Sequence, residues 1–235
     1  MCSGPALGLL LLHALPFDGA MWSEQMGLLP GATCAPALYS LGDDIGDWAR
    51  GALAMASGQR LIVVGCSVGG SCAIEVAAAA PGRVAALVLI GTKAAHRPEP
   101  ALRARALETL RDDGMEAAWP AFWKPLLSPR ANPRTLARAR QLAVGLRPSD
   151  VARGVSAFHG RPDRDGFLAS FQRPVHVVTG VDDMTPGLRT SAAQASAAPE
   201  GHLHIIAECG HYVPLEQPGR LNALLSTIIK AEQRI

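Results

Sequence analysis

The residues best suited to joint chemistry are a serine, a histidine and an aspartate that each follow a predicted strand. Ser67 lies within Gly65-Cys66-Ser67-Val68-Gly69-Gly70, directly after an apolar run and directly before a predicted helix. Glycines on both sides of the serine allow a sharp turn that lifts its hydroxyl clear of a sheet. Because a helix begins with free amides, the Val68 N–H would face negative charge developing at this turn. The pattern predicts a serine nucleophile at Ser67.

A serine hydroxyl becomes nucleophilic when a base removes its proton, and His211 is the best placed of the seven histidines. It follows the last predicted strand, in a loop that contains Gly210 and precedes a helix. Three other histidines lie inside strand-like runs, where a structural role is expected: His176, His202 and His204. No further ligand spacing supports a metal site, so none is predicted.

The third group required is a carboxylate that orients the histidine, and the loop after the run Pro174–Thr179 holds two candidates. Asp182 and Asp183 are adjacent and therefore point differently, so only one should reach His211. The other is expected to cap the helix that begins near Pro186. The chain order of serine, aspartate and histidine fits a catalytic triad on a parallel sheet.

A second backbone amide is needed beside that of Val68 to hold negative charge on a reacting oxygen. The loop after the first predicted strand, residues 12–22, would lie beside the turn at Ser67 if the two strands are near neighbours in the sheet. We expect the Leu15 N–H to be this donor. His13 is expected to brace the same loop next to a substrate pocket.

Short apolar runs alternate with longer amphipathic stretches along the chain. The runs are Leu7–Leu12, Ala35–Leu41, Leu61–Gly65, Ala85–Ile90, Pro174–Thr179 and His202–Ile206. The predicted helices between them are Ile45–Ala56, Val68–Ala80, Leu188–Ala198 and Leu215–Ala231. Apolar runs joined by helices indicate a parallel sheet covered on both faces, so the predicted fold class is α/β.

The alternation is interrupted between Ile90 and Pro174, where only helical patterns occur. The predicted helices are Pro100–Asp113, Met115–Leu127, Asn132–Val144 and Ser149–His159. We expect a core domain of residues 1–92 and 166–235, with a helical cap, residues 93–165, over the carboxyl ends of the strands, where ligands bind in open parallel sheets. Trp119, Phe122 and Trp123 are either the lining of an apolar substrate pocket or the core of this cap.

Composition excludes several classes of partner. The 235 residues include 22 basic and 20 acidic side chains, a net charge of +2, which offers no electrostatic reason for a nucleic-acid or membrane partner. Five cysteines without a CxxC pair favour a reduced, cytoplasmic protein. The apolar stretch from Ala6 to Leu15 is too short to span a bilayer. A small-molecule substrate is expected, and both a monomer and a homodimer remain open.

These motifs resemble the α/β-hydrolase superfamily, and within it the small capped esterases and lactonases, such as 3-oxoadipate enol-lactonases and pimeloyl-carrier-protein methyl esterases. The resemblance extends from about Leu7 to the last helix and implies a largely parallel sheet of about six strands. The antiparallel strand pair that usually opens this fold has no room before Leu7. Compared with relatives, the acid loop is one residue short. Counting from Gly180 favours Asp183 as the triad acid and counting back from Pro186 favours Asp182; we choose Asp183.

The resemblance implies cleavage of an ester, lactone or thioester through a covalent acyl-enzyme, without a metal or organic cofactor. The Val68 and Leu15 amides would form the oxyanion hole. Enzymes of the same fold offer a second interpretation: a carbon–carbon bond hydrolase, an acyltransferase or a cyclase. A ligand-binding protein without catalysis is a third, although such a protein has no use for a complete serine, aspartate and histidine set.

Overall fold

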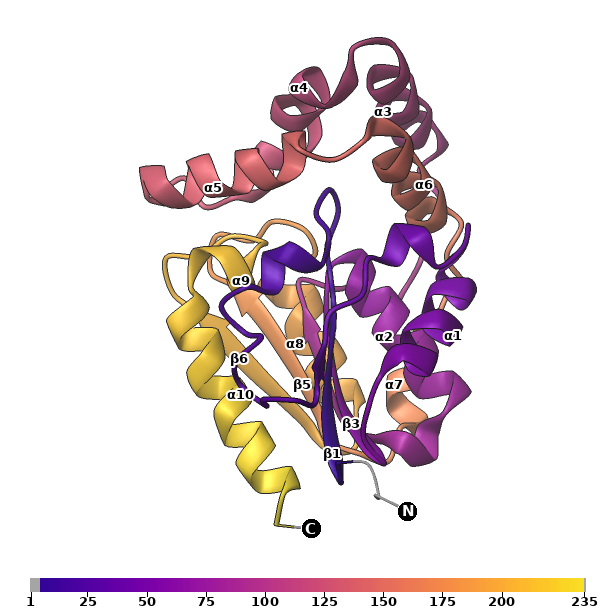
Figure 1. Ribbon diagram of the computed structural model, residues 1–235, viewed down its shortest axis with the longest axis vertical. Helices are drawn as coiled ribbons and strands as arrows, with labels where there is room; N and C mark the ends of the chain where they lie inside the picture. The colour runs from indigo at the N-terminus through magenta and orange to yellow at the C-terminus, as the bar shows by residue number, and fades with distance from the viewer. Residues whose placement is uncertain (1–4, 235) are drawn as a thin grey trace.

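A computed structural model describes residues 5–234, which form a six-stranded, entirely parallel sheet with helices on both faces (Figure 1). The strands are β1 (Leu7–Leu12), β2 (Thr33–Cys34), β3 (Arg60–Cys66), β4 (Val84–Ile90), β5 (Val175–Gly180) and β6 (Gly201–Ile206). Their order across the sheet is β2-β1-β3-β4-β5-β6. The predicted α/β fold class, with a parallel sheet of six strands, is confirmed.

The strand register brings the chemically important loops to one rim. Leu12 at the end of β1 pairs with Gly65 of β3, and Cys66 at the end of β3 pairs with Ile90 at the end of β4. Gly180 and Ile206 pair in the same way at the ends of β5 and β6. Because parallel strands in register end together, the loops that follow them meet at the carboxyl edge of the sheet.

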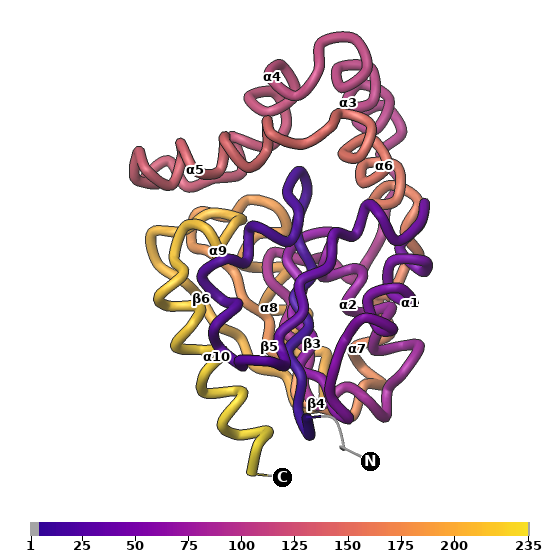
Figure 2. Tube along the Cα trace, viewed as in Figure 1, coloured from indigo at the N-terminus to yellow at the C-terminus, as the bar shows by residue number. Residues whose placement is uncertain are grey.

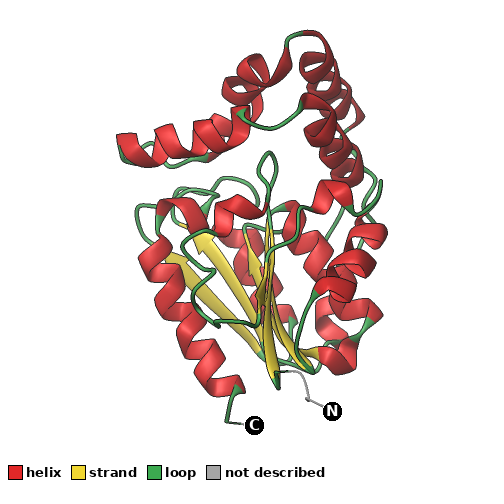
Figure 3. Ribbon diagram, in the orientation of Figure 1, coloured by secondary structure: helices red, strands yellow, loops and turns green. Residues whose placement is uncertain are grey.

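Helices enclose the sheet, which lies between α10 on one side and α1 and α2 on the other (Figure 3). Strands β1, β3 and β4 are apolar and almost fully buried, as expected for a sheet covered on both faces. The helices outside the long insertion are α1 (Ile45–Met55), α2 (Val68–Ala79), α7 (Phe167–Ser170), α8 (Gly187–Ala197), α9 (Val213–Glu216) and α10 (Pro218–Glu232).

The insertion between β4 and α7 is helical and lies over the carboxyl ends of the strands (Figure 2). Its elements are α3 (Pro100–Asp112), α4 (Gly114–Ala118), the π-helical turn η4 (Trp119–Trp123), the 3₁₀ turn η5 (Lys124–Leu126), α5 (Pro133–Val144) and α6 (Pro148–His159). We call residues 93–165 the helical segment. Helix α6 packs against α3 and reaches the core.

The predicted strand Ala35–Leu41 is wrong. Pairing with β1 occurs just before it, at Thr33–Cys34, and the chain then forms a 3₁₀ turn, η2, over Leu38–Ser40. Pro36 has no N–H to donate to a sheet ladder, so pairing stops there. Leu38 and Tyr39 are nevertheless buried, and this burial explains why the segment reads as an apolar run.

Two predicted helices are interrupted by proline. Met115–Leu127 is divided among α4, η4 and η5, with Pro120 and Pro125 each near the start of a new turn. The C-terminal helix is likewise divided before Pro218 into α9 and α10. Since proline lacks an N–H and clashes with the preceding turn, each break follows from local chemistry.

No helix in residues 5–234 is long and apolar enough to cross a membrane. Cys34, Cys66, Cys72 and Cys209 are free thiols, and burial raises the pKa of each. Cys2 lies outside the described residues.

The turn after β3 requires glycine at position 65. A Cβ on Gly65 would lie 2.2 Å from the carbonyl oxygen of Gly69, a backbone atom that cannot move aside without opening the turn. We expect Gly65→Ala to lower the free energy of unfolding by about 1–3 kcal/mol in urea denaturation. Gly82→Ala is the control, because nothing lies within 4 Å of its Cβ position. Equal midpoints for the two variants would contradict this role for Gly65.

We expect the histidines of β5 and β6 to make the folded protein less stable in acid. Burial, followed by the neighbouring His204 and His202, lowers the pKa of His176 from 6.5 to about 4. Between pH 6.5 and 4 the unfolded chain binds a proton at His176 that the folded chain does not bind. The free energy of unfolding therefore falls as the pH drops over this range. We expect the urea midpoint to fall over this range, and to fall less in His176→Gln. A pH-dependence identical in the two proteins would contradict the assignment.

Candidate active site

Ser67 occupies the sharp turn between β3 and α2, with φ of 54° and ψ of −118°. This conformation is unfavourable for a residue with a side chain, and it is characteristic of functional sites. The Ser67 N–H donates to the carbonyl of Ile90 at 2.8 Å, which ties the turn to the end of β4. Ser67 is partly exposed while its neighbours in the turn are buried, so its hydroxyl is the group presented at the rim.

His211 and Asp183 form a buried pair at the same rim. The Nδ1 atom of His211 lies 3.1 Å from Asp183 Oδ2 and 3.2 Å from Oδ1, and both side chains are almost fully buried. A carboxylate at Nδ1 selects the tautomer that leaves Nε2 free to accept a proton. Asp183 is itself held by the Thr185 N–H, which donates to Oδ1 at 2.8 Å.

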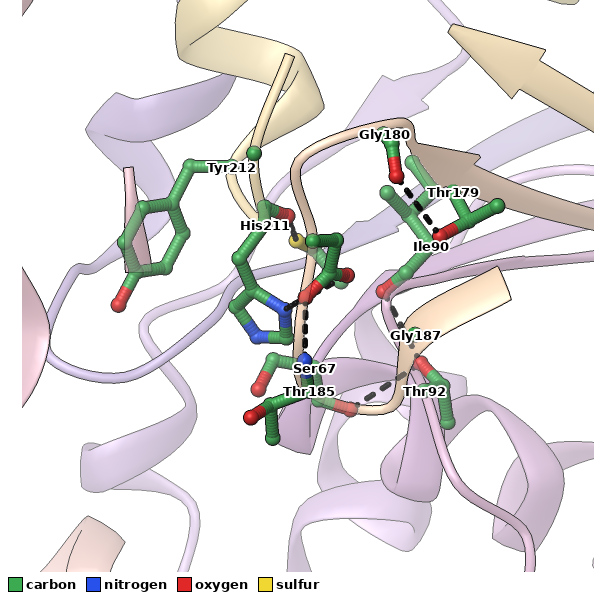
Figure 4. Close-up of polar contacts among 12 residues, drawn as sticks. Ser67, Ile90, Thr92, Thr179, Gly180, Thr185, Gly187, His211 and Tyr212 are labelled. Carbon is green, nitrogen blue, oxygen red and sulfur yellow. Dashed lines mark hydrogen bonds and ion pairs between the residues drawn. The ribbon is translucent and has the colours of Figure 1, made fainter. Parts of the chain in front are cut away.

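Ser67 lies beside the imidazole of His211 in Figure 4, and both side chains line one cavity. Within residues 5–234 no hydrogen bond joins the Ser67 hydroxyl to His211. Bonds between a nucleophile and its base are often long until a substrate is in place, so this geometry is compatible with proton transfer.

Gly91 is a part of the site that the sequence patterns did not reveal. It follows β4 with φ of 56°, and a Cβ there would lie 2.8 Å from His211 Nδ1 and 3.1 Å from Asp183 Oδ2. The absence of a side chain therefore makes room for the histidine–carboxylate pair. The signal in the sequence was a glycine at the end of an apolar strand, which many turns share.

The loop that carries His211 is held by a buried glutamate, Glu216. Its carboxylate accepts the N–H groups of Gly210 at 3.0 Å and Tyr212 at 3.1 Å, on either side of His211, and that of Ser128 at 2.8 Å. Burial raises the pKa of Glu216, and these three bonds oppose the shift. Sequence reasoning missed Glu216 because its three partners are known only once the chain is folded.

The helical segment takes part in this arrangement. The His211 N–H donates to the carbonyl of Leu126 at 2.9 Å, and Ser128 follows two residues later. The segment thus supplies an acceptor to His211 and a donor to Glu216. It contacts the backbone of the His211 loop directly.

Asp182 does not cap the helix after Pro186, as we predicted for the second aspartate. Its carboxylate accepts the hydroxyl of Ser128 at 2.6 Å and pairs with Arg130 at 2.7 Å. The bonds from Ser128 and Arg130 lower the pKa of Asp182. Helix α8 begins after Pro186 without a side-chain cap. The two aspartates lie at a turn closed by the Asp183 N–H, which donates to the Gly180 carbonyl at 3.2 Å, and their side chains diverge: Asp183 reaches His211 and Asp182 reaches the helical segment.

The two predicted oxyanion donors lie at the same rim. Neither the Val68 N–H nor the Leu15 N–H donates a hydrogen bond to any residue in the described range 5–234. The Leu15 loop is braced by Tyr212, whose buried hydroxyl donates to the Leu15 carbonyl at 3.0 Å. Two amides without internal partners can serve an external acceptor.

His13 braces the Leu15 loop from inside the core. Its side chain is fully buried, and Nε2 accepts the Leu38 N–H at 2.9 Å. Burial lowers the pKa of His13 to about 4, so the ring is neutral and accepts this bond at neutral pH. This bond ties the loop to the segment at η2. His13 does not line the cavity that contains Ser67 and His211, next to which it was expected.

The cavity that opens over Ser67 and His211 has a volume of about 210 Å³, and we call it the main cavity because it contains both residues. Leu15, Phe122, Trp123, Leu126, Val155 and Phe158 are among its apolar lining residues. Trp119, predicted with the pocket residues, lies outside it and packs edge-on against Phe17 at 6.1 Å between ring centroids. The aromatic cluster is therefore divided, with Phe122 and Trp123 in the cavity and Trp119 in the packing beneath.

The histidines of the sheet edge form a separate cluster. His176 Nδ1 lies 3.1 Å from His204 Nε2, and the His176 ring stacks on His202 at 4.8 Å. In the part of the chain that is described, no group of three or more His, Cys, Asp or Glu residues has a geometry that could hold a metal ion.

A serine at a strand–helix turn, facing a buried histidine–aspartate pair on a parallel sheet, is the arrangement of an α/β hydrolase. The chain belongs to the alpha/beta hydrolase family, which its residues 9–224 match.

Relatives in this family carry several activities. The chain is 27% identical to a pimeloyl-[acyl-carrier protein] methyl ester esterase of Aromatoleum aromaticum, covering 94% of this chain and 98% of that protein. It is also 27% identical to a 2-hydroxymuconate semialdehyde hydrolase of Pseudomonas putida, over 73% of this chain and 63% of that protein.

Solved structures show the same fold. A thermophilic esterase from Thermogutta terrifontis, determined with malate bound, is 25% identical and superposes with a TM-score of 0.86 over 98% of this chain and 92% of that one. An enol-lactonase from Burkholderia xenovorans LB400, 19% identical, gives a TM-score of 0.79 over 98% of this chain and 94% of its own.

The contacts of the two aspartates predict very different effects on kcat when each is changed to asparagine. Asp183→Asn should lower kcat for an activated ester about 10³- to 10⁴-fold, because the amide selects the wrong tautomer of His211. Asp182→Asn removes only a partly exposed ion pair and should change kcat by less than about 5-fold. Steady-state kinetics on both variants provides the measurement. A greater loss for Asp182→Asn would assign the acid to that residue.

Proposed function

We propose that this protein is a serine hydrolase that cleaves an ester, lactone or thioester with Ser67 as nucleophile, His211 as base and Asp183 as the acid that orients it. The observation that carries the proposal is the joint placement of Ser67 and the His211–Asp183 pair at one cavity. A strained serine and a buried, oriented imidazole are the two components that nucleophilic catalysis requires.

In the proposed reaction, His211 Nε2 takes the hydroxyl proton as Ser67 Oγ attacks the carbonyl carbon. The Val68 and Leu15 amides hold the negative oxygen of the tetrahedral intermediate. The intermediate collapses, the bond to the leaving group breaks, and His211 returns the proton to that group. Water then attacks the acyl-enzyme with His211 again as base, which releases the acid and restores Ser67.

We further propose that residues 93–165 act as a cap on a core formed by residues 1–92 and 166–235. The cap supplies Phe122, Trp123 and Val155 to the cavity lining, and its position over the strand ends supports this division. The apolar lining favours an apolar acyl group, because burying each methylene contributes about 0.8 kcal/mol. The cavity volume of about 210 Å³ favours a group of small to medium size.

Carbon–carbon bond hydrolysis is the second candidate, since one relative is named a 2-hydroxymuconate semialdehyde hydrolase and another, 24% identical, a 2-hydroxy-6-oxononadienedioate/2-hydroxy-6-oxononatrienedioate hydrolase. The same serine, histidine and aspartate would serve either reaction. Parallel assays on simple esters and on a vinylogous 1,5-diketone would separate them, because an ester hydrolase leaves the carbon–carbon bond intact.

The nucleophile is tested by one substitution and one label. Ser67→Ala should lower kcat for p-nitrophenyl acetate or butyrate on the order of 10⁴-fold or more, since it removes the attacking oxygen. A fluorophosphonate should label the wild type at Ser67, as located by peptide mass spectrometry. Ser196→Ala, on the exposed face of α8, is the control and should still be labelled at Ser67. Labelling elsewhere, or a near-wild-type rate in Ser67→Ala, would refute the mechanism.

A further inference from the structure

A small chamber of about 20 Å³ opens beside the candidate nucleophile. Its lining includes Ser67, His211, Ser71, Lys93, Arg161 and Thr185. Ser67 and His211 also line the main cavity, so the two spaces meet at the reacting atoms. A substrate with its carbonyl at Ser67 could therefore extend into the chamber through a link of only a few atoms.

Arg161 is a buried cation without an anion. Its side chain belongs to a residue only 6% exposed, and no carboxylate in residues 5–234 forms an ion pair with it. One guanidinium nitrogen, Nη1, donates to the carbonyl of Phe158 at 2.6 Å, and the guanidinium carbon lies 3.9 Å from the centre of the Phe158 ring. The Nε atom is buried with no acceptor.

Burial lowers the pKa of Arg161 to about 10, despite the more distant charges of Glu99 and Asp163. A buried charge without a partner is costly, and proteins seldom retain one unless it serves a ligand. The unpaired Arg161 therefore indicates an anion that comes from outside the chain.

Lys93 adds a second cation to the chamber. It follows β4 by three residues, is half-buried, and forms no ion pair with any residue of the described chain. Arg164, which lines a neighbouring pocket together with Lys93 and Arg161, is already matched, because it holds both oxygens of Glu75 at 2.7 and 2.8 Å. Glu99 lines the main cavity but not the chamber.

We propose that Lys93 and Arg161 form a subsite for a carboxylate of the substrate, within a few atoms of the bond that is cleaved. The inference rests on the proposed function and specifies its substrate class: a carboxylic ester, lactone or thioester with one anionic end and one apolar end. The apolar group occupies the main cavity, and the hydroxyls of Ser71 and Thr185 offer further donors to the anion.

The size of the chamber favours a carboxylate over larger anions. A single water molecule needs about 10–15 Å³ of cavity. A chamber of about 20 Å³ is therefore small enough to admit only a compact group. The two oxygens of a planar carboxylate meet that limit. A guanidinium is also the side chain that best matches a carboxylate through paired N–H donors.

The first test compares substrates on the wild-type protein. Monomethyl succinate and monomethyl glutarate carry the carboxylate, and the methyl esters of succinamic and glutaramic acids are neutral compounds of nearly the same shape. We expect kcat/KM at pH 7.5 to be about 10- to 100-fold higher for the acids, because hydrogen bonds to a charged carboxylate stabilise a complex more than hydrogen bonds to a neutral amide. Equal values, or a preference for the amides, would overturn the subsite.

The second test measures how variants change that preference. Lys93→Gln and Arg161→Gln should each lower the acid-to-amide ratio of kcat/KM about 10-fold, mainly through KM for the acid. Arg161→Lys should retain part of the ratio. Arg138→Gln, on the exposed face of α5, changes the net charge equally and should leave the ratio unchanged. If kcat/KM fell equally for the acid and for the amide, the residue would have a structural role and the proposal would be contradicted.

Two outcomes separate this inference from the proposed function. The first outcome is that fluorophosphonate labels Ser67 and the amide esters are hydrolysed, but the acids are not preferred. This outcome would refute the subsite and leave the proposed hydrolase function standing. Failure to label Ser67 would refute the hydrolase first. If Arg161→Gln does not fold, Lys93→Gln carries the test, because Lys93 is only half-buried.

Discussion

The turn at Ser67 is the constraint on which the rest of this structure depends. One residue with a positive φ links β3 to α2, and it is held by the N–H bond to Ile90 at the end of the neighbouring strand. The strain is tolerated because the sheet and α2 are buried on both sides and leave the chain no other path. All the other groups of the site come to this one point because the parallel strands end in register.

The inserted helices do more than cover the strand ends. Through the carbonyl of Leu126 and the N–H of Ser128 they contact the His211 loop and Glu216, and through Arg130 they hold Asp182, next to the residue that orients His211. A movement of these helices would therefore shift the backbone of the histidine loop.

Buried charge is distributed unevenly around the rim. Asp183 is satisfied by His211 and the Thr185 N–H, and Glu216 by three backbone donors. Arg161 has a carbonyl and an aromatic ring but no anion. The cost of a buried charge depends on its partners. Arg161, in the lining of the small chamber beside Ser67, is therefore the charge at this rim that the protein leaves unmatched.

The parallel α/β sheet, the turn at Ser67 and the position of His211 after the last strand can be predicted from the amino-acid sequence, because local periodicity and glycine placement encode strands, helices and turns. The sequence pattern misplaced one strand, where Pro36 ended the pairing early. Three features become visible once the chain is folded. Asp183 contacts His211 while Asp182 pairs with Arg130, Glu216 holds the histidine loop, and Arg161 lies unpaired beside Ser67. These arrangements depend on how loops from different parts of the chain pack against one another, and no local pattern records that packing.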